Sequence, residues 1–441
     1  MLPHEVQAIL HRLNDAGHQA YLVGGCVRDM LLGTAPHDWD ITTSAMPEET
    51  MALFDHFAIP TGLQHGTVSV RSGAIWCEVT TFRADGEYPD HRHPAAVTFT
   101  RSLHEDLRRR DLTVNAMAMD VDGVLHDPFG GQEDLRHGIL RCVGKPTQRF
   151  SEDALRILRT LRFSATLGFL IDEDTRRAMH LQRGDLAYVA AERVREELTK
   201  LLCGKDVRRV LLREVQVLGA VLPEVLPCVD FDQCNRHHCY DVWEHTACAV
   251  AAAPPQPVLR WVMLLHDRGK PDCFTLDGRG VGHFYGHQHK SVELAEDICR
   301  RLRFEKAEAQ RICTLVAHHD RPIALTEKAI RRAMNQLGVE TLRELCAVKR
   351  ADNMAQHPDY RSRQQEIDTG EAIMDALLAR DACFSLRQLA VNGHDMAALG
   401  LEGRKIGEML HSLLDAVLDG TLENDRAALL AWAEEEMRHK A

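Results

Sequence analysis

Two carboxylates near the start of the chain could hold a metal ion for phosphate chemistry. Asp38 and Asp40 stand at positions i and i+2, and if residues 38–42 form a strand, both side chains share one of its faces. Two like charges held this close repel each other unless a cation lies between them. Mg2+ prefers such oxygen ligands and commonly brings substrate phosphates with it. The pair therefore predicts a magnesium site for a phosphate-bearing substrate.

A glycine pair just upstream suits the same chemistry. Gly24 and Gly25 follow the apolar run at 20–23, and glycine lets backbone amides approach a phosphate closely. Arg28 adds a fixed fork of donors. An Asp-x-Asp pair after a glycine turn also occurs in ordinary surface loops, so the interpretation depends on the residues that follow.

A hairpin is expected next. Residues 66–70 and 74–82 alternate in polarity around Arg71-Ser72-Gly73, which is typical of two antiparallel strands. This hairpin would bring Glu78 beside the two aspartates as a third carboxylate. The alternative for Glu78 is an exposed strand residue with no role in chemistry.

A basic segment follows at 108–115. We expect a helix that begins near Arg109 and continues through Met119, with Arg110, Asp111 and Asn115 near its start. Basic side chains and an amide at a helix N-terminus could bind a triphosphate and ribose hydroxyls. A capped, solvated helix start is the alternative.

Strand signals fade after residue 150. Apolar spacing over 155–163 predicts a helix, and a second helix is expected around 192–198, where ordinary ion pairs explain the charges. Four charged residues recur every three positions and are expected to share one broad face of the first helix. They are Asp153, Arg156, Arg159 and Arg162.

Histidines and aspartates dominate residues 230–360. His266-Asp267 follows an apolar helix, with His245 before it and Asp352 far behind, and this pattern resembles the HD phosphohydrolase superfamily. Imidazole and carboxylate ligands suit Mg2+ or a transition metal such as Mn2+, Ni2+ or Co2+ that activates water. The alternative is a vestigial fold that keeps its ligands without the activity.

Composition and net charge limit the partners and the cellular compartment that we expect for this chain. The net charge of −12 argues against indiscriminate nucleic-acid binding, so any RNA contact should be local. Thirteen cysteines without a Cys-x-x-Cys pair indicate reduced thiols and a cytoplasmic protein. The N-terminus lacks a secretion signal and no apolar run approaches a membrane span, so we expect no membrane partner.

Taken together, these motifs resemble bacterial-type (class II) tRNA nucleotidyltransferases, the CCA-adding enzymes, through most of the chain. The resemblance implies an α+β fold: a polymerase β-like nucleotidyltransferase head with a mixed β-sheet, then an all-α neck, an HD-type body and a helical tail that contacts tRNA. The expected boundaries are 1–145, 146–228, 229–365 and 366–441. It also associates the polar loop at 83–94 with addition of the final A.

The resemblance implies untemplated addition of C, C and A to the 3' end of tRNA from CTP and ATP. Asp38 and Asp40 would bind two Mg2+ ions with Glu78 as helper, and Arg28 and Arg110 would hold phosphate oxygens. Cytosine and adenine both present an amino donor beside a ring-nitrogen acceptor, which a carboxylate and a guanidinium complement. Base recognition would therefore fall to Asp153 and Arg156. The other expected nucleotide-binding residues are Gly24, Gly25, Asp111, Asn115, Arg159 and Arg162.

Several alternatives stay open at this point. A poly(A) polymerase has a similar head and neck, but usually carries a basic tail and no HD segment. An enzyme that adds only the terminal A, a silent tRNA-binding protein and an HD phosphohydrolase with a silent head are the others. The sequence leaves the oligomeric state and the HD substrate open.

Overall fold

The computed structural model describes residues 2–85 and 97–439. It divides into two compact units, Met1–Leu226 with Arg301–Arg303, and Pro227–Arg300 with Phe304–Ala441. The division at 226/227 lies two residues before the expected boundary at 228/229. The other expected boundaries remain predictions, and each unit is described by itself.

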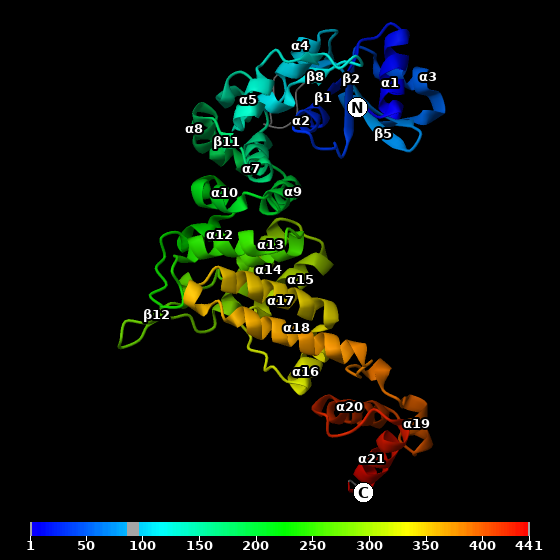
Figure 1. Cartoon of the computed structure of the whole chain (residues 1–441), viewed down its shortest axis with the longest axis vertical. Helices are drawn as coiled ribbons and strands as arrows, with labels where there is room; N and C mark the ends of the chain where they lie inside the picture. The colour runs from blue at the N-terminus through cyan, green and yellow to red at the C-terminus, as the bar shows by residue number, and fades with distance from the viewer. Residues whose placement is uncertain (1, 86–96, 440–441) are drawn as a thin grey trace. The chain divides into compact units, whose positions relative to one another are not determined.

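A mixed sheet forms the N-terminal part of the first unit (Figure 1). Its strand order is β3-β4-β5-β2-β1-β8-β9. Strands β2 and β5 run parallel, whereas the other neighbours are antiparallel. The strands are β1 (Ala20–Val23), β2 (Trp39–Thr43), β3 (Ala58–Gly62), β4 (Thr67–Ser72), β5 (Ile75–Thr81), β8 (Ala118–Met119) and β9 (Leu125–His126). This sheet, followed by a mostly helical chain, confirms the α+β expectation.

The predicted hairpin is present as β4 and β5. Ser72 pairs with Ile75 next to the turn, and Ser69 pairs with Glu78 further along. Apolar side chains of both strands face the core, with Val68, Val70 and Val79 at most 1% exposed. The alternation in the sequence therefore set both the strands and their register.

Helices cover the sheet and extend the first unit. They are α1 (His4–Asp15), α2 (Gly25–Leu31), α3 (Pro47–Phe54), α4 (Leu103–Arg108), α5 (Gly131–His137), α6 (Pro146–Glu152), α7 (Leu155–Leu167), α8 (Glu173–Gln182), α9 (Ala191–Leu202), α10 (Val207–Arg213) and α11 (Val215–Leu218). In α1 the helical spacing buries Val6, Ile9, Leu10 and Leu13. The two helices expected after residue 150 are α7 and α9, which pack against each other.

The helix expected over 109–119 is wrong. Helix α4 ends at Arg108, residues Thr113–Asn115 form one 3-10 turn, and Ala118–Met119 are strand β8. Nearly every side chain from Leu112 to Ala118 is buried, and so short an apolar run does not reveal whether it is a helix or a buried strand. Arg110 and Asp111 therefore follow the end of a helix instead of starting one.

Among the residues that the structure describes, three short strand pairs lie outside the main sheet. The first joins β6 (Arg83–Asp85) to β7 (Val97–Phe99), so the start of the loop expected at 83–94 is a strand. The rest of that loop, 86–94, lies outside the described residues. Strands β10 (Ile139–Leu140) and β11 (Leu170–Ile171) pair in parallel, which places a two-residue strand in the neck expected to be all-α. The third pair, β12 (Thr275–Leu276) and β13 (Gly282–His283), belongs to the second unit.

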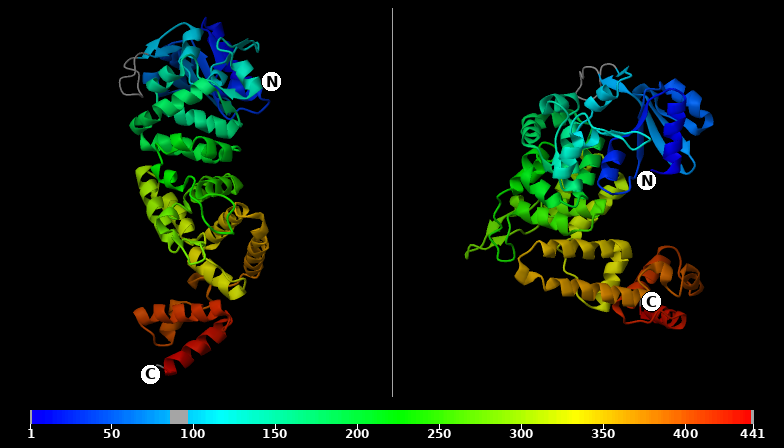
Figure 2. Two further views of the ribbon diagram at one scale, coloured as in Figure 1. Left: turned by 90° about the vertical axis from the view of Figure 1, so that its left-hand side faces the viewer. Right: turned by 45° about the horizontal axis from the view of Figure 1, so that its top comes forward.

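The second unit is a set of packed helices (Figures 1 and 2). They are α12 (Val242–Ala252), α13 (Pro257–Leu265), α14 (His287–Arg301), α15 (Lys306–His318), α16 (Glu327–Leu337), α17 (Val339–Met354), α18 (Arg363–Ala379), α19 (Gly393–Ala398), α20 (Arg404–Asp419) and α21 (Arg426–His439). Helix α17 packs against α12, α13, α15, α16 and α18. The boundary expected between 365 and 366 falls inside α18.

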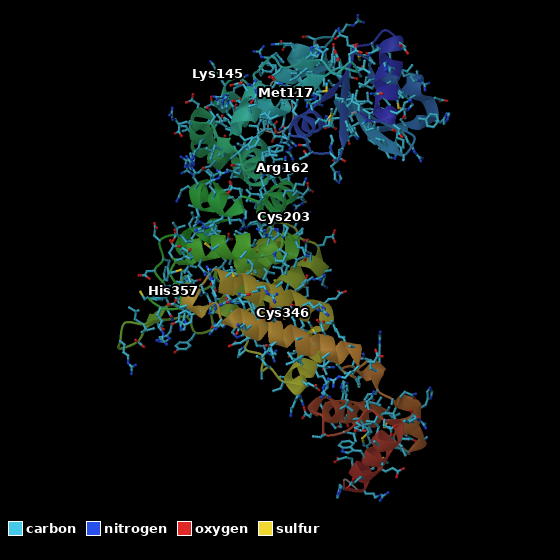
Figure 3. The ribbon with its side chains drawn as sticks, viewed as in Figure 1. Met117, Lys145, Arg162, Cys203, Cys346 and His357 are labelled. Carbon is cyan, nitrogen blue, oxygen red and sulfur yellow. The ribbon has the colours of Figure 1, made fainter. Side chains whose placement is uncertain are left out.

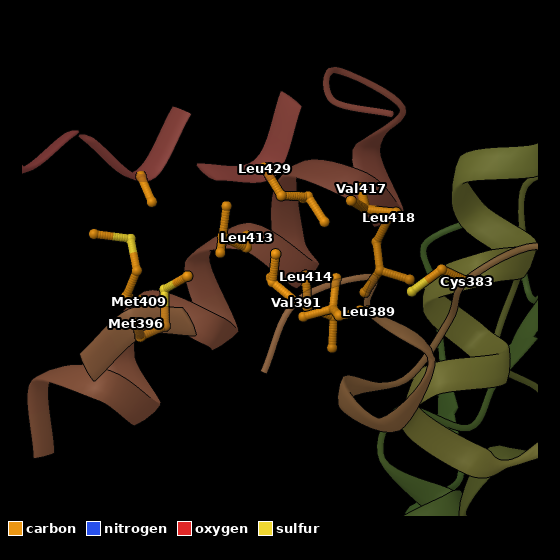
Figure 4. Packing of buried hydrophobic residues seen from close by; sticks show 11 residues of the cluster. Cys383, Leu389, Val391, Met396, Met409, Leu413, Leu414, Val417, Leu418 and Leu429 are labelled. Atoms are coloured by element: carbon orange, nitrogen blue, oxygen red, sulfur yellow. The ribbon is translucent and has the colours of Figure 1, made fainter. Parts of the chain in front are cut away.

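The C-terminal helices share a core of their own (Figure 4). Leu413 and Leu414 of α20 pack with Leu429 of α21, Met396 of α19 and Val391 before it. Helices α20 and α21 have 16 and 14 residues and account for most of the helical tail. Within the described residues, no helix has the length and apolar character needed to cross a membrane.

Candidate functional site

The three carboxylates expected at the head site lie on and beside two parallel strands. Asp40 of β2 and Glu78 of β5 are paired residue for residue, so their side chains leave the same face of the sheet. Asp38 lies one residue before β2 and its side chain is 85% exposed. The strand therefore starts one residue later than expected.

The charges of these carboxylates act on one another. Burial raises the pKa of the Asp40 carboxyl, and Arg110 opposes that shift. Both Glu78 and Asp38 raise the same pKa further. Repulsion of this kind is relieved when a divalent cation binds between the carboxylates. The donor set and its electrostatics thus fit Mg2+, which prefers oxygen ligands.

Gly24 brings the backbone against this site. Its φ is +77°, a left-handed conformation that favours glycine. A Cβ there would lie 3.0 Å from Nη1 of Arg110 and 3.9 Å from Oδ2 of Asp40. Gly25 does not share this role, because it begins helix α2. A side chain at position 24 would both strain the backbone and displace Arg110.

Two arginines beside the carboxylates have different surroundings. Nη1 of Arg28 donates to Oδ1 of Asn115 at 2.7 Å, and its Nε and Nη2 donate to Asp29. Arg110 donates to Asp106 at 3.3 Å, and within the described residues its buried Nε has no hydrogen-bond partner. Arg110 is thus the arginine beside Asp40 that keeps an unused donor, whereas Arg28 is held by protein partners.

A partly buried ion pair connects this site to helix α7. Arg159 donates to Oδ2 of Asp111 at 2.8 Å, and Asn115 donates to Oδ1 at 3.2 Å. Burial raises the pKa of Asp111, but these contacts outweigh it and hold the pKa well below its usual range. Arg162, labelled in Figure 3, pairs with Glu197 of α9 at 2.9 Å. The α7 arginines therefore position the head against its neighbouring helices.

The two residues expected to recognise the base also form hydrogen bonds within the protein. Asp153 ends α6 instead of lying in α7, which corrects the expected shared helix face. Its Oδ1 accepts from the backbone of Leu155 and its Oδ2 accepts from Arg193 at 3.1 Å. Arg156 donates to Glu152 at 2.6 Å and to the carbonyl of Arg109 at 2.9 Å. Both side chains are held by protein partners in one region of the first unit.

The second unit contains the histidine cluster expected from the sequence. Ligand atoms of His245, His266, Asp267 and Asp352 all lie within 4.8 Å of one another. A second group consists of Asp267, His287 and His319, so the two groups share Asp267. His287 and His319 stand within the sequence motifs but were not predicted as ligands.

The four histidine rings are oriented so that each Nε2 faces the cluster. Each Nδ1 faces a backbone carbonyl: that of Ala355 at 3.2 Å for His245, Met263 at 2.8 Å for His266, Phe284 at 2.8 Å for His287 and Val316 at 2.7 Å for His319. A carbonyl only accepts, so Nδ1 carries the proton and the Nε2 lone pair of a neutral ring is left for a ligand.

Facing Nε2 atoms also have the spacing of metal ligands. His245 and His266 Nε2 atoms are 3.3 Å apart, and so are those of His287 and His319. Two nitrogens bound at about 2.1 Å to one tetrahedral ion lie roughly 3.4 Å apart. Burial lowers the pKa of His266, yet Asp267 and Asp352 raise it to about 9, because both carboxylates favour a positive charge. A cation between these groups fits the cluster better than a proton alone.

Three family models match the chain. The head domain of poly A polymerase matches residues 20–141, the RNA and SrmB-binding site of polymerase A matches 168–228, and tRNA nucleotidyltransferase domain 2 matches 286–433. With the mixed sheet and its paired carboxylates, these matches define a nucleotidyltransferase.

Comparison with individual proteins identifies the family within the nucleotidyltransferases. A CCA-adding enzyme from Geobacillus stearothermophilus is 36% identical over 98% of this chain and 97% of its own. Another from Oceanobacillus iheyensis is 51% identical, over 50% of this chain and 54% of that relative, so this alignment spans about half of the relative's length. The crystal structure of the Bacillus stearothermophilus CCA-adding enzyme in complex with CTP has a TM-score of 0.73 and 31% identity, covering 100% of this chain and 99% of that one. The chain belongs to the CCA-adding enzyme family.

Proposed function

We propose that this protein adds C, C and A, without a template, to the 3' end of tRNA from CTP and ATP. The observation that carries the proposal is the pairing of Asp40 with Glu78 on parallel strands, beside Gly24 and Arg110. Structures of similar enzymes with CTP, with ATP and with tRNA support the choice of substrates.

Asp38 and Asp40 would hold two Mg2+ ions, with Glu78 as helper. Bound there, the metal would make the tRNA 3'-hydroxyl a better nucleophile and neutralise the triphosphate. Arg110, whose Nη1 lies beside Gly24, would bind phosphate oxygens, and Gly24 would leave room for the triphosphate. Arg28 and Asn115, tied to each other, would shape the wall of this site. The reaction is in-line attack on the α-phosphorus, so these residues supply geometry and charge.

Asp153 and Arg156 would select the base. The carboxylate accepts from the amino group of C or A, while the guanidinium donates to the ring nitrogen. Uracil and guanine present the reverse order of donor and acceptor and are rejected. Because Arg193 and Glu152 hold these two side chains, the base would have to compete with, or rearrange, those contacts. The remaining α7 residues, Arg159 and Arg162, would position this part of the site.

The experiment supplies purified protein with tRNA that lacks its last three nucleotides and with one nucleoside triphosphate at a time. Addition from CTP alone, and of A only after CTP, supports the proposal. Long A tails would favour a poly(A) polymerase. Addition of A only to tRNA that already ends in CC would favour an A-adding enzyme.

A second activity is favoured by the histidine cluster. We propose that the two groups around Asp267 bind divalent ions such as Mn2+, Ni2+, Co2+ or Mg2+ and hydrolyse small phosphoesters. Such ions would supply an activated water and polarise the phosphoryl oxygen. The support is the set of four Nε2 lone pairs aimed at shared carboxylates.

The test for this activity compares His266→Ala with His289→Ala. His289 is exposed on α14 outside both groups, which makes it a matched control. The first substitution should remove metal-dependent hydrolysis of 2',3'-cyclic nucleotides and reduce metal binding measured by calorimetry. CCA addition should be spared by both. No hydrolysis by the unaltered protein with any of the four metals would leave the cluster a structural role.

A further inference from the structure

A cavity of about 400 Å3, lined by apolar and by polar side chains, lies between helices α16, α17 and α18. Its apolar lining comes from these helices and from the segment before α16. The side chains are Ile323, Leu325, Ile330, Leu342, Ile367 and Met374. We call this space the apolar cavity. Cys346 of α17, labelled in Figure 3, also lines it.

A second cavity of about 370 Å3 opens onto the metal cluster. Asp267 and His287 line it, together with Lys270 and the aromatic side chains of Phe284 and Tyr285. The two cavities have five lining residues in common: His319, Asp320, Asp352, Gln356 and Arg363. Two of these, His319 and Asp352, belong to the cluster. The apolar cavity therefore begins where the metal ligands are.

The junction of the cavities suits a phosphate. Arg363 is exposed at the start of α18, and within the described residues its side chain makes no hydrogen bond or ion pair. A guanidinium in that position can bind phosphate oxygens next to the metal ligands. By contrast, Lys349 is committed, because its Nζ donates to the carbonyls of His319 and Arg321.

Gly370 forms part of the wall of the apolar cavity. It lies inside α18, and a Cβ there would be 3.6 Å from Leu325 and 4.0 Å from Ile330, which is ordinary van der Waals contact. A larger side chain at this position can therefore extend into the cavity without displacing backbone. Position 370 offers a way to fill the cavity while leaving every cluster residue in place.

We infer that the metal cluster acts on phosphoesters whose alcohol carries an apolar chain or ring, and that this group occupies the apolar cavity. The inference rests on the proposed phosphohydrolase function and specifies its substrate class. In the reaction, a water oxygen bonds to phosphorus and the ester P–O bond breaks. The alcohol departs with the proton that the water gives up. Neither oxidation nor reduction is involved.

The first test measures binding. Methyl-, propyl- and hexylphosphonate are titrated into the full-length protein with Ni2+, and each Kd is determined by calorimetry. Burial of one methylene group is worth a gain in affinity of about fourfold, so Kd should fall steeply from methyl to hexyl. Gly370→Leu should abolish most of that gain and leave methylphosphonate binding unchanged. Gly407→Leu, an exposed helical glycine with open space around it, is the control.

The second test measures hydrolysis of the corresponding methyl, propyl and hexyl phosphate esters. Rising kcat/KM with chain length, lost in Gly370→Leu, is the expected result. Hydrolysis that does not depend on chain length would overturn the inference and leave the phosphohydrolase function standing. No hydrolysis of any ester with Mg2+, Mn2+, Ni2+ or Co2+ would overturn both. The chain-length series on the unaltered protein decides the matter even if Gly370→Leu does not fold.

Discussion

Asp40 and Glu78 lie opposite each other on the parallel strands β2 and β5, although 38 positions separate them in the chain. The β4–β5 hairpin delivers Glu78 to this position, since β5 pairs with β4 on one side and with β2 on the other. Burial raises the pKa of Asp40, and the negative charges of Glu78 and Asp38 raise it further. This relationship makes the head site a candidate for metal-dependent chemistry.

Replacing Asp40 by Asn should remove nucleotide addition. The substitution keeps the shape of the side chain but removes one of the charges that would hold the metal, and losing several kcal/mol of transition-state stabilisation slows a reaction on the order of 10^3-fold. Single-turnover addition to truncated tRNA is the measurement. tRNA binding, measured separately by filter retention, should change little.

The control for Asp40→Asn is Glu48→Gln. Glu48 is an exposed carboxylate of α3 in the same unit, so it tests whether loss of any negative charge affects the rate. Asp38→Asn should resemble Asp40→Asn. An Asp40 variant that retains half of the activity would remove this residue from the site.

The sequence could predict this part of the fold because its strands are amphipathic. Val68, Val70 and Val79 alternate with exposed residues, which fixes the face on which Glu78 lies. The segment from Leu112 to Ala118 has no such alternation, because it is buried almost throughout. Its conformation depends on tertiary packing, so the expected helix could not be distinguished from the turn and strand that are present.

Base choice is predicted to depend on Asp153 and Arg156. Asp153→Ala and Arg156→Ala should lower kcat/KM with CTP and ATP and raise the relative use of UTP or GTP. A site that hydrogen-bonds its substrate can reject a wrong partner by up to about 10^4 to 10^5, and each substitution should forfeit part of that factor. The measurement is kcat/KM for all four triphosphates on truncated tRNA.

An exposed pair of α8 supplies the control for base choice. Arg177, which pairs with Asp174 at 3.4 Å, can be replaced by Ala without touching the neck contacts of Arg156. Equal slowing with every nucleotide in the Asp153 or Arg156 variants would indicate that these residues act structurally, through Arg193 and Glu152.

Metal binding in the second unit should follow the division of the cluster. His287→Ala should weaken the binding of one metal ion and leave the binding of the other unchanged, because His245, His266 and Asp352 belong to the other group. Asp267→Asn should weaken the binding of both metal ions, since the two groups share Asp267. Metal content after dialysis, measured by elemental analysis, distinguishes these results. Equal loss in both variants would mean that the groups do not bind separate ions.

The stability of the first unit should depend on pH through Asp111. Its pKa is lowered by Arg159 and Asn115 against the effect of burial. A carboxyl group with a lowered pKa in the folded state stabilises the protein at pH values above its unfolded-state pKa of about 3.9. This stabilisation is lost as the pH falls toward and through the folded-state pKa. Asp111→Asn should cost about 1.5 kcal/mol at pH 7, because it removes a charged hydrogen-bond partner from Arg159, whose side chain is partly exposed.

This cost should shrink as the pH falls from 5 to 3, because the unfolded chain then protonates Asp111 while the folded protein keeps it ionised. Chemical denaturation at several pH values measures it, with the exposed Asp122→Asn as control. A cost that stays constant down to pH 3 would contradict the role given to the Asp111 charge.

The histidine cluster shows where sequence reasoning stops. Spacing identified His245, His266, Asp267 and Asp352, because an HD pair with flanking ligands is a specific pattern. The roles of His287 and His319 depend on the tertiary packing that brings both side chains to Asp267, which no local pattern contains. For the same reason no sequence pattern indicated the apolar cavity, whose walls come from three helices and the segment before α16.

The most direct test of the central claim is the sequence of the tRNA 3' end after reaction. Purified protein is incubated with tRNA that lacks its last three nucleotides, together with CTP, ATP, UTP, GTP and Mg2+, and the products are sequenced. The account predicts that C, C and A are added in that order and that addition then stops. A run of A residues, incorporation of U or G at comparable frequency, or no extension in the presence of Mg2+ would contradict it.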